Sequence, residues 1–300
     1  MILVTGACGY VGSVLVPKLL SAGHLVTVHD IMWFGNFLEP HRNLTVIRSD
    51  IRNYVPLKDV DAIIHLASVA NDPCSELDPK LSWEVNVLAT MRLADHAARH
   101  KISRFIYASS GSVYGVKKED QVTEVLSCEP LSEYNKTKMV AERVLLSYPS
   151  LNAQIIRPAT VCGVSPRMRL DVAVNTLTMQ AISKRKITVL GGEQIRPNIH
   201  IEDMTDLYLF MLGRPELTGI YNAGFENLSI MQIAEMVRSR IGGNIEVKPS
   251  TDPRSYRMNS DKLLATGFKP SRTVSDAISE IAASGIKDED KCYNLKMMPR

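Results

Sequence analysis

A tyrosine and a lysine near the middle of the chain are spaced so that a helix would place them side by side. Tyr134 and Lys138 are four residues apart in the segment Tyr-Asn-Lys-Thr-Lys, and residues with this spacing share one face of a helix. An ammonium group beside a phenol favours the phenolate and brings a group with an ordinary pKa of about 10 toward neutral pH. The pair therefore predicts a general base that removes a proton from a hydroxyl group.

Two other tyrosine–lysine pairs have the same spacing, and their local sequence separates them from the first. Tyr54–Lys58 contains a proline and follows a strand, and Tyr114–Lys118 begins at a glycine turn. Proline and glycine both oppose a helix interior. Only Tyr134–Lys138 lies in a helix-compatible segment, from about residue 131 to 147. An ordinary pair on the surface remains the alternative interpretation.

Three serines upstream of this pair compete for a second role. An apolar strand runs into the segment Ser-Ser-Gly-Ser, which contains Ser109, Ser110 and Ser112. A serine at the carboxyl end of a parallel strand projects into the crevice where ligands bind. Ser110 would donate a hydrogen bond to a substrate oxygen and align it with Tyr134, but the spacing alone does not separate it from the other two serines.

The amino terminus has the pattern of a strand, a glycine turn and a helix. Ile2–Val4 is apolar, glycines follow at Gly6, Gly9 and Gly12, and apolar residues then keep helical spacing up to Gly23. The glycines let the backbone turn sharply and approach a pyrophosphate, and the helix directs its free N–H groups at the phosphates. The pattern predicts a dinucleotide site, with an ordinary strand–helix turn as the alternative.

A second strand, Leu25–Asp30, ends in a carboxylate about 20 residues after the glycines, where an NAD site has the acidic residue that binds the ribose. Ile31 and Met32 follow, and no arginine is present there to bind a 2′-phosphate. Asp30 therefore favours NAD over NADP. The alternative is a turn residue that ends the strand.

Strand-like runs alternate with helical segments along the first half of the chain. Further strands are expected at 44–48, 62–67, 104–110 and 154–157, and long helices at 79–100 and 131–147. This alternation predicts right-handed crossovers and a mostly parallel sheet. The expected fold class is α/β, with a Rossmann-type doubly wound parallel sheet and a smaller, mostly helical C-terminal substrate-binding domain.

The pattern changes near Cys162, which sets the expected domain boundary. We expect an NAD-binding domain at 1–162 and a substrate-binding cap at 163–300, with the segment at about 198–224 packing back on the first domain. The charged tail from about Lys287 is expected to be loosely held.

Composition excludes several functional classes. The chain has 300 residues, 45% of them hydrophobic, and a net charge of +3. No basic stretch is interleaved with aromatic residues, which disfavours nucleic acid as a partner, and no apolar run is long enough to predict a membrane span. The five cysteines form no Cys-x-x-Cys motif, which fits reduced thiols in the cytoplasm. His96 and His100 lack a third ligand motif nearby, so no metal site is predicted.

Together these motifs resemble those of the extended short-chain dehydrogenase/reductases. Within that group the chain is similar to the NAD-dependent epimerase/dehydratase family that acts on nucleotide sugars, of the UDP-glucose 4-epimerase kind. The resemblance covers nearly all of residues 1–285. Besides the segments above, it rests on Asp50-Ile-Arg52, His65-Leu-Ala67, Glu84-Val-Asn86, Arg157-Pro158, Arg196-Pro-Asn-Ile-His-Ile-Glu-Asp203 and Arg254-Ser-Tyr-Arg257.

The resemblance implies a role for each matching residue. Ser110 matches the catalytic Ser/Thr, Tyr134 the base, and Lys138 the lysine that bonds the nicotinamide ribose and lowers the pKa of the tyrosine. The residues expected to bind NAD are Gly6, Gly9, Tyr10, Val11, Gly12, Asp30, Asp50, Ile51, Leu66, Ala67, Asn86, Tyr134 and Lys138. Those expected to bind a nucleotide-diphosphate sugar are Ser112, Asn175, Arg196 and Arg254.

Arginines suit a diphosphate because a guanidinium binds two oxygens at once. The alternative is that Arg196 or Arg254 is an ordinary surface charge.

One difference from the family's motifs disfavours elimination of water as the reaction. Members that eliminate water from the sugar carry Asp-Glu directly after the catalytic Ser/Thr, whereas this chain has Gly111 and Ser112. We therefore expect an NAD-dependent 4-epimerase that oxidises a sugar hydroxyl transiently. The alternatives are an NAD(P)H-dependent 4-keto-sugar reductase or dehydrogenase, and an NAD-sensing protein without turnover.

Two further segments resemble parts of the family. Asn71-Asp-Pro-Cys74 lies in the loop after the fourth strand and is interpreted as a turn, rather than as a source of an additional acid or thiol. The helices at 79–100 and 131–147 resemble those that form a four-helix dimer interface, so the resemblance implies a homodimer.

Overall fold

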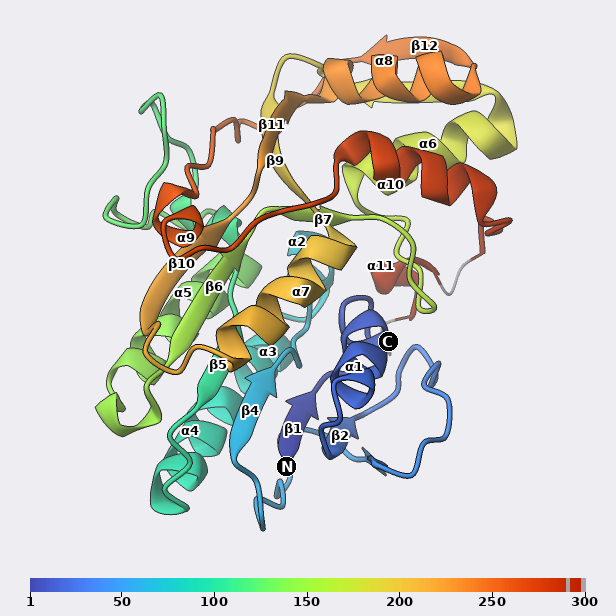
Figure 1. Ribbon diagram of the computed structural model, residues 1–300. Helices are drawn as coiled ribbons and strands as arrows, with labels where there is room; N and C mark the ends of the chain where they lie inside the picture. Colours follow the sequence, from blue (N-terminus) through green and yellow to red (C-terminus); the bar gives the residue numbers. More distant parts are fainter. Residues whose placement is uncertain (290–291, 298–300) are drawn as a thin grey trace.

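The computed structural model describes residues 1–289 and 292–297, and its largest element is a seven-stranded sheet (Figure 1). The strand order is β10-β6-β5-β4-β1-β2-β3, and every neighbouring pair is parallel. The predicted α/β class is therefore confirmed. The strands are β1 (Ile2–Thr5), β2 (Val26–Asp30), β3 (Leu44–Arg48), β4 (Ala62–His65), β5 (Phe105–Ala108), β6 (Gln154–Pro158) and β10 (Gly219–Ala223).

The order of the strands reverses between β1 and β4. From β1 the chain proceeds through β2 to β3, and from β4 it proceeds in the opposite direction through β5 and β6 to β10. Ligands of open parallel sheets bind outside the carboxyl ends of the strands at such a reversal. The glycine turn follows β1, and the loop that begins at Leu66 follows β4. Both segments therefore lie where a ligand is expected.

Helices cover both faces of the sheet, which explains the apolar runs of its strands. Val4 and Ile64 pack into one hydrophobic core, and their neighbours Leu3 and Ile63 pack into another. The first face is covered by α1 (Gly12–Ser21) and α7 (Ile201–Leu212), which contact each other. The second is covered by α4 (Thr90–Arg99) and α5 (Glu133–Leu146), seen behind the sheet in Figure 1.

The helix predicted at 79–100 is interrupted, and another helix precedes it. α3 (Pro79–Trp83) continues into the π-helix η1 (Glu84–Ala89) and then into α4, while α2 (Asp72–Leu77) occupies the segment predicted to be a turn. Asn71 has a turn-like φ of 79°, and its side chain accepts a 3.0 Å hydrogen bond from the Cys74 N–H. The same residue types favour turns and helix N-caps. Local sequence therefore did not distinguish the two.

A cap formed by the second half of the chain lies over the carboxyl ends of the strands (Figure 1). It has its own hydrophobic core and two small sheets, of order β11-β9-β7 and β12-β8. Two elements of this half belong instead to the large sheet, since β10 pairs with β6 and α7 packs on α1. The short helix α9 (Asp261–Leu264) likewise contacts β10, and its Leu263 packs into the core of the large sheet. The cap elements are β7 (Thr160–Cys162), α6 (Ala173–Lys184), β8 (Lys186–Leu190), β9 (Ile195–His200), β11 (Glu226–Ser229), α8 (Ile230–Ile241), β12 (Asn244–Lys248) and α10 (Val274–Ala283).

The end of the described chain is packed, whereas the sequence predicts a loosely held tail from about Lys287. Cys292 and Asn294 are each 5% exposed. The Cys292 carbonyl accepts a 2.8 Å hydrogen bond from the Leu170 N–H. The short helix α11 (Asn294–Met297) follows and contacts α2.

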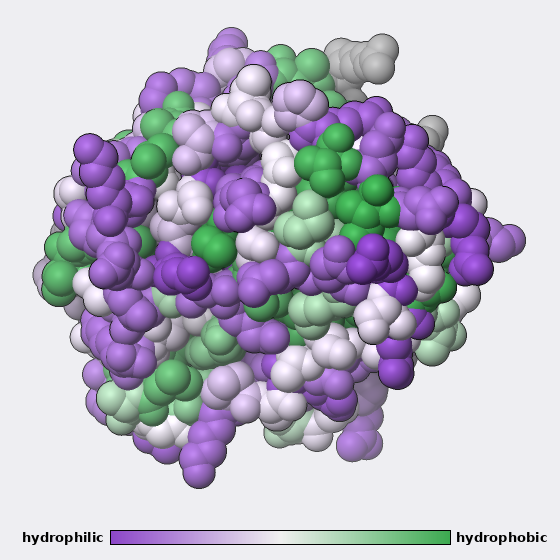
Figure 2. All heavy atoms as spheres, turned by 90° about the horizontal axis from the view of Figure 1, so that it is seen from above, coloured by the Kyte–Doolittle hydropathy of each residue, from purple (hydrophilic) through white to green (hydrophobic). Residues whose placement is uncertain are grey.

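Seen from the cap side, the surface is mainly hydrophilic, with apolar side chains in small groups (Figure 2). Within residues 1–289 and 292–297, none of the helices combines the length and apolar character that crossing a bilayer requires.

Four of the cysteines, Cys8, Cys74, Cys128 and Cys162, are free thiols.

Candidate active site

A cavity of about 730 Å³ lies between the carboxyl ends of the strands and the cap. Its volume is in the range of small-molecule sites. The loops after β1, β2, β3, β4, β5 and β6 form most of its wall, and the cap and residues 293–296 complete it. The cavity therefore occupies the position that the strand order favours for a ligand.

The glycine turn after β1 depends on the absence of side chains. Gly6 has a φ of +69°, and a Cβ added there would lie 2.5 Å from the Ala67 Cα. A Cβ on Gly12 would lie 2.4 Å from the Ala7 Cα. Heavy atoms cannot approach so closely, so both positions require glycine for packing, and Gly6 requires it for its backbone conformation as well. The turn lies against the cavity, where Gly6 and Gly12 form part of the wall.

The start of α1 presents backbone donors to the cavity. Within the described ranges, the N–H groups of Tyr10 and Val11 have no hydrogen-bond acceptor, and both residues line the cavity. Free N–H groups at a helix N-terminus bind phosphate oxygens. These donors and the closely packed glycines fit the pyrophosphate of a dinucleotide.

Asp30 lies at the end of β2 and also lines the cavity. Its carboxylate accepts hydrogen bonds of 2.9 Å from the Cys8 N–H and 2.6 Å from the Met32 N–H. Burial raises the pKa of Asp30, and these two hydrogen bonds oppose that shift. The bonds hold the carboxylate beside the glycine turn, where its remaining lone pairs can accept ribose hydroxyls.

The other residues predicted to bind the dinucleotide separate into two groups. Asn86 is buried behind the cavity wall, where its amide accepts a 2.8 Å hydrogen bond from the Val69 N–H and donates one of 3.0 Å to the Thr137 Oγ. It therefore joins the loop after β4 to α5. The remaining four line the cavity directly: Asp50, Ile51, Leu66 and Ala67.

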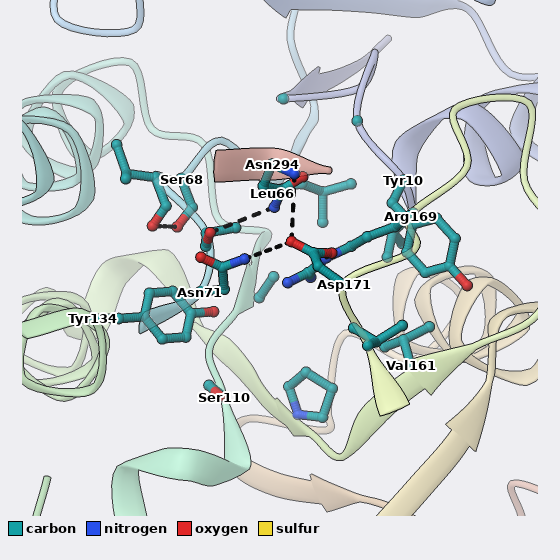
Figure 3. A pocket seen from close by; sticks show the side chains of 18 of the residues that line it. Tyr10, Leu66, Ser68, Asn71, Ser110, Tyr134, Val161, Arg169, Asp171 and Asn294 are labelled. Carbon is teal, nitrogen blue, oxygen red and sulfur yellow. Dashed lines mark hydrogen bonds and ion pairs between the residues drawn. The ribbon is translucent and has the colours of Figure 1, made fainter. Parts of the chain in front are cut away.

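Tyr134 and Lys138 lie one turn apart in α5, and both face the cavity. The Lys138 Nζ lies 5.8 Å from the centre of the Tyr134 ring and donates a 2.8 Å hydrogen bond to the Ala108 carbonyl at the end of β5. The helix spacing read from the sequence thus brings the phenol and the ammonium group together. Figure 3 shows the Tyr134 hydroxyl directed into the cavity.

The three serines after β5 have different surroundings. The Ser109 hydroxyl donates to the buried Glu142 carboxylate and is engaged away from a ligand. The Ser110 and Ser112 hydroxyls lie 2.7 Å apart at the start of the 3₁₀ helix η2 (Gly111–Tyr114), and both residues line the cavity. The Ser112 hydroxyl also donates to the Asn135 side chain. Ser110 is therefore better placed than Ser109 to reach a ligand beside Tyr134.

Burial in the cavity shifts the pKa values of Tyr134 and Lys138 in opposite directions. Burial raises the pKa of Tyr134 to about 12, although the Arg169 guanidinium and a hydrogen bond with Ser110 oppose this shift. Burial lowers the pKa of Lys138 to about 7. The sequence predicts that Lys138 lowers the pKa of Tyr134, whereas the largest lowering influence in the structure comes from Arg169, which no sequence motif pointed to.

Arg169 is fixed on the side of the cavity opposite Tyr134 (Figure 3). Its Nε donates a 2.6 Å hydrogen bond to Asp171, and the Asn71 amide donates one of 2.7 Å to the other oxygen of the same carboxylate. Asn71 belongs to the loop after β4, so this cluster connects that loop to the segment after β7. The sequence signal was present as two arginines close to an aspartate in Arg167-Met-Arg-Leu-Asp171.

The two arginines expected to bind diphosphate lie together at the cavity wall. Arg196 and Arg254 both pair with Asp252, at 2.8 and 2.7 Å. Arg254 also pairs with Asp72 at 2.5 Å. Their shared carboxylate fixes the guanidinium groups side by side, which suits an anion with several oxygens.

Asn175, the fourth residue expected to bind the substrate, is not brought to the cavity. Its side chain is fully buried and accepts a hydrogen bond of 3.1 Å from the Gly163 N–H. Its amide donates to the Tyr10 hydroxyl at 3.1 Å and to the Arg169 carbonyl at 2.8 Å. Asn175 thus supports the backbone of Arg169 from behind the cavity wall.

Known proteins resemble the chain in both sequence and structure. A model of the NAD dependent epimerase/dehydratase family matches residues 2–224. A putative UDP-glucose 4-epimerase of Methanocaldococcus jannaschii is 27% identical over 297 residues, which are 94% of this chain and 97% of that protein. UDP-glucuronic acid decarboxylase 1 of Xenopus tropicalis is 26% identical over 318 residues, covering 100% of this chain and 75% of that protein.

The structural resemblance extends over both the sheet and the cap. The crystal structure of UDP-glucuronic acid 4-epimerase from Bacillus cereus, in complex with UDP-glucuronic acid and NAD, has a TM-score of 0.84 and 27% sequence identity. The match covers 94% of this chain and 98% of that one. Its bound NAD agrees with the free N–H donors and the glycines that line this cavity. The chain therefore belongs to the NAD-dependent epimerase/dehydratase family of enzymes, and its cofactor is NAD.

Proposed function

We propose that this enzyme is a nucleotide-sugar epimerase of the 4-epimerase type, with Tyr134 as its general base. The strongest support is that Ser110, Tyr134 and Lys138 line the same cavity as the glycine turn. A pair of adjacent arginines lies in the same cavity and suits the diphosphate of the substrate. The relatives named as epimerases agree with this proposal.

Each residue has a defined part in the proposed reaction. Tyr134 accepts the proton of the sugar hydroxyl and later returns it, so that a keto-sugar forms and is then reduced on its other face. Ser110 donates a hydrogen bond that holds the reacting oxygen, and the Lys138 ammonium and the Arg169 guanidinium stabilise the phenolate. Bound NAD supplies the chemistry of taking up a hydride and giving it back. Arg196 and Arg254 bind the diphosphate and hold the sugar against Tyr134.

The expected result is interconversion of two epimeric nucleotide sugars by the purified protein without added cofactor. Because the hydride returns in every cycle, the absorbance of NADH should stay constant while the second epimer appears by NMR. A 4-keto-sugar reductase or dehydrogenase would instead consume or form NADH stoichiometrically. Protein that binds NAD but converts no nucleotide sugar would support the sensor alternative and contradict the proposal.

A second candidate is an enzyme of the same type whose sugar carries a carboxylate. The observation that favours it is Arg169, a guanidinium fixed opposite Tyr134 by Asp171. A cation in this position would pair with an acidic group on the sugar ring. The Bacillus cereus and Xenopus tropicalis relatives are both named for UDP-glucuronic acid. We infer that a nucleotide uronic acid is preferred over the neutral sugar.

Replacing Arg169 with leucine should lower kcat/KM for UDP-glucuronic acid relative to UDP-glucose by about 10- to 100-fold, since a charged hydrogen bond contributes about 1.5–3 kcal/mol. Any effect of Arg169 on the ionisation of Tyr134 cancels in the ratio of the kcat/KM values for the two substrates. Arg169→Lys keeps the charge and should retain part of the preference. An unchanged ratio in Arg169→Leu would exclude this role for the arginine.

We also propose that the enzyme is a cytoplasmic homodimer that pairs through the 79–100 and 131–147 segments. Large apolar side chains on these segments are exposed, with exposed fractions of 43% for Leu88, 40% for Met91 and 41% for Leu146. Burial of such side chains against a second copy would remove them from water. A monomer mass by light scattering would contradict the dimer.

A further inference from the structure

The last described residues of the chain form part of the cavity wall. Tyr293, Asn294, Leu295 and Lys296 all line the cavity, although they are more than a hundred residues away in sequence from the glycine turn and from Tyr134. The family model ends at residue 224 and does not include them. Figure 3 shows Asn294 at the cavity, with a dashed line that joins it to Asp171.

Asn294 connects the two sides of the cavity. Its Oδ1 accepts a 2.6 Å hydrogen bond from the Arg167 guanidinium, and its N–H lies 3.4 Å from Asp171. Its side-chain amide donates a 3.4 Å hydrogen bond to the Ala70 carbonyl in the loop after β4. A buried side chain with these partners ties the sheet loops to the segment after β7.

Neighbouring contacts hold the same segment against the dinucleotide end of the cavity. Cys292 packs with Tyr10 of the glycine turn in one hydrophobic cluster, and its carbonyl bonds to the Leu170 N–H. Arg167, which Asn294 holds, lies with its guanidinium carbon 3.7 Å from the centre of the Phe34 ring. Phe34 belongs to the loop after β2, four positions after Asp30 in the sequence, and also lines the cavity. The segment thus contacts the loops after β1 and β4 directly, and it contacts the loop after β2 through Arg167.

We propose that Cys292–Lys296 form a strap that retains NAD in the cavity, and that Asn294 is the residue that fastens it. The proposal rests on NAD as the cofactor and deepens the proposed function, because an epimerase restores its NAD in every cycle and has no need to release it. Exchange of NAD requires the strap to open, and opening breaks the hydrogen bonds of Asn294. The rate of NAD release therefore depends on this residue.

The test is the rate at which the full-length protein, loaded with radiolabelled NAD, releases the label into an excess of unlabelled NAD. Asn294→Ala should release it about 10- to 100-fold faster, the change expected for loss of a hydrogen bond to a charged group. A chain that ends at Glu289 should release it at least as fast. Asn294→Asp keeps an acceptor for Arg167 and should retain NAD better than the alanine variant.

Lys287→Ala is the matched control, because Lys287 is an exposed residue of the same tail that does not line this cavity. Its release rate should equal that of the unchanged protein, and circular dichroism should show the same fold in all variants. Equal release rates for Asn294→Ala, the shortened chain and the unchanged protein would overturn the strap. Faster release from the variants of a protein that converts no nucleotide sugar would support the strap while contradicting the epimerase.

Discussion

Replacing Tyr134 with phenylalanine is expected to lower kcat by about 10²- to 10⁴-fold, the usual contribution of a positioned general base. The phenyl ring keeps the packing of α5, but it has no oxygen to accept the proton of the sugar hydroxyl. Lys138 and the glycine turn remain in place, so NAD should bind as before. The measurement is kcat with saturating nucleotide sugar, together with the amount of NAD bound to the purified variant.

Tyr107→Phe is the matched control for this substitution. Tyr107 lies in β5, close to the site, with its ring 5.0 Å from the Lys138 Nζ, and its buried hydroxyl has no hydrogen-bond partner among the described residues. Removal of an unpaired hydroxyl should leave kcat nearly unchanged. Loss of activity in both variants to the same extent would show that Tyr134 has no special role.

The second large effect is expected on stability, from Glu142→Ala. Glu142 and Arg157 are 1% and 2% exposed and form two hydrogen bonds, of 2.9 and 2.6 Å. Removal of the carboxylate leaves the guanidinium buried without its countercharge, which costs about 3–5 kcal/mol in comparable pairs. Urea unfolding should therefore show a decrease of this size in the free energy of unfolding, unless the variant fails to fold.

Two further variants make this prediction specific. Glu142→Gln keeps an acceptor for Arg157 and for the Ser109 hydroxyl, and should be less destabilising than Glu142→Ala. Glu235→Ala removes a solvent-exposed pair with Arg238 and should have almost no effect, because exposed ion pairs contribute little. A decrease for Glu142→Ala no larger than that for Glu235→Ala would contradict the proposed importance of the buried pair.

The parts of the site that the sequence predicted are those with local signals. The glycine turn and Asp30 follow strands at the spacing typical of a dinucleotide site, and Tyr134 and Lys138 share a helix face by their spacing alone. The sheet was predictable for the same reason, since apolar strands alternating with helices restrict the topology to a parallel sheet. In each case, the residues that produce the signal lie within about thirty positions of one another in the sequence.

The parts that the sequence did not predict depend on contacts between distant residues. Asn71 donates a hydrogen bond to Asp171, which is 100 positions away in sequence, and Asn294 donates one to Ala70, which is 224 positions away. No local pattern predicts that Arg169 faces Tyr134 or that residues 293–296 line the cavity. Asn86 and Asn175 show the converse. Asn86 matches a position that lines the cofactor in the family, and Asn175 falls near one that contacts the substrate, yet both are buried behind the cavity wall, where their amides bond to the backbone.

The most direct test of the central claim is conversion of UDP-glucuronic acid and UDP-glucose by the purified protein in deuterated water, followed by proton NMR. Transient oxidation by retained NAD predicts a 4-epimer that keeps protium at C4, with no added cofactor and no accumulation of NADH, because the hydride removed from C4 returns to it. Deuterium from the solvent at C4, or NADH formed in proportion to product, would contradict this account.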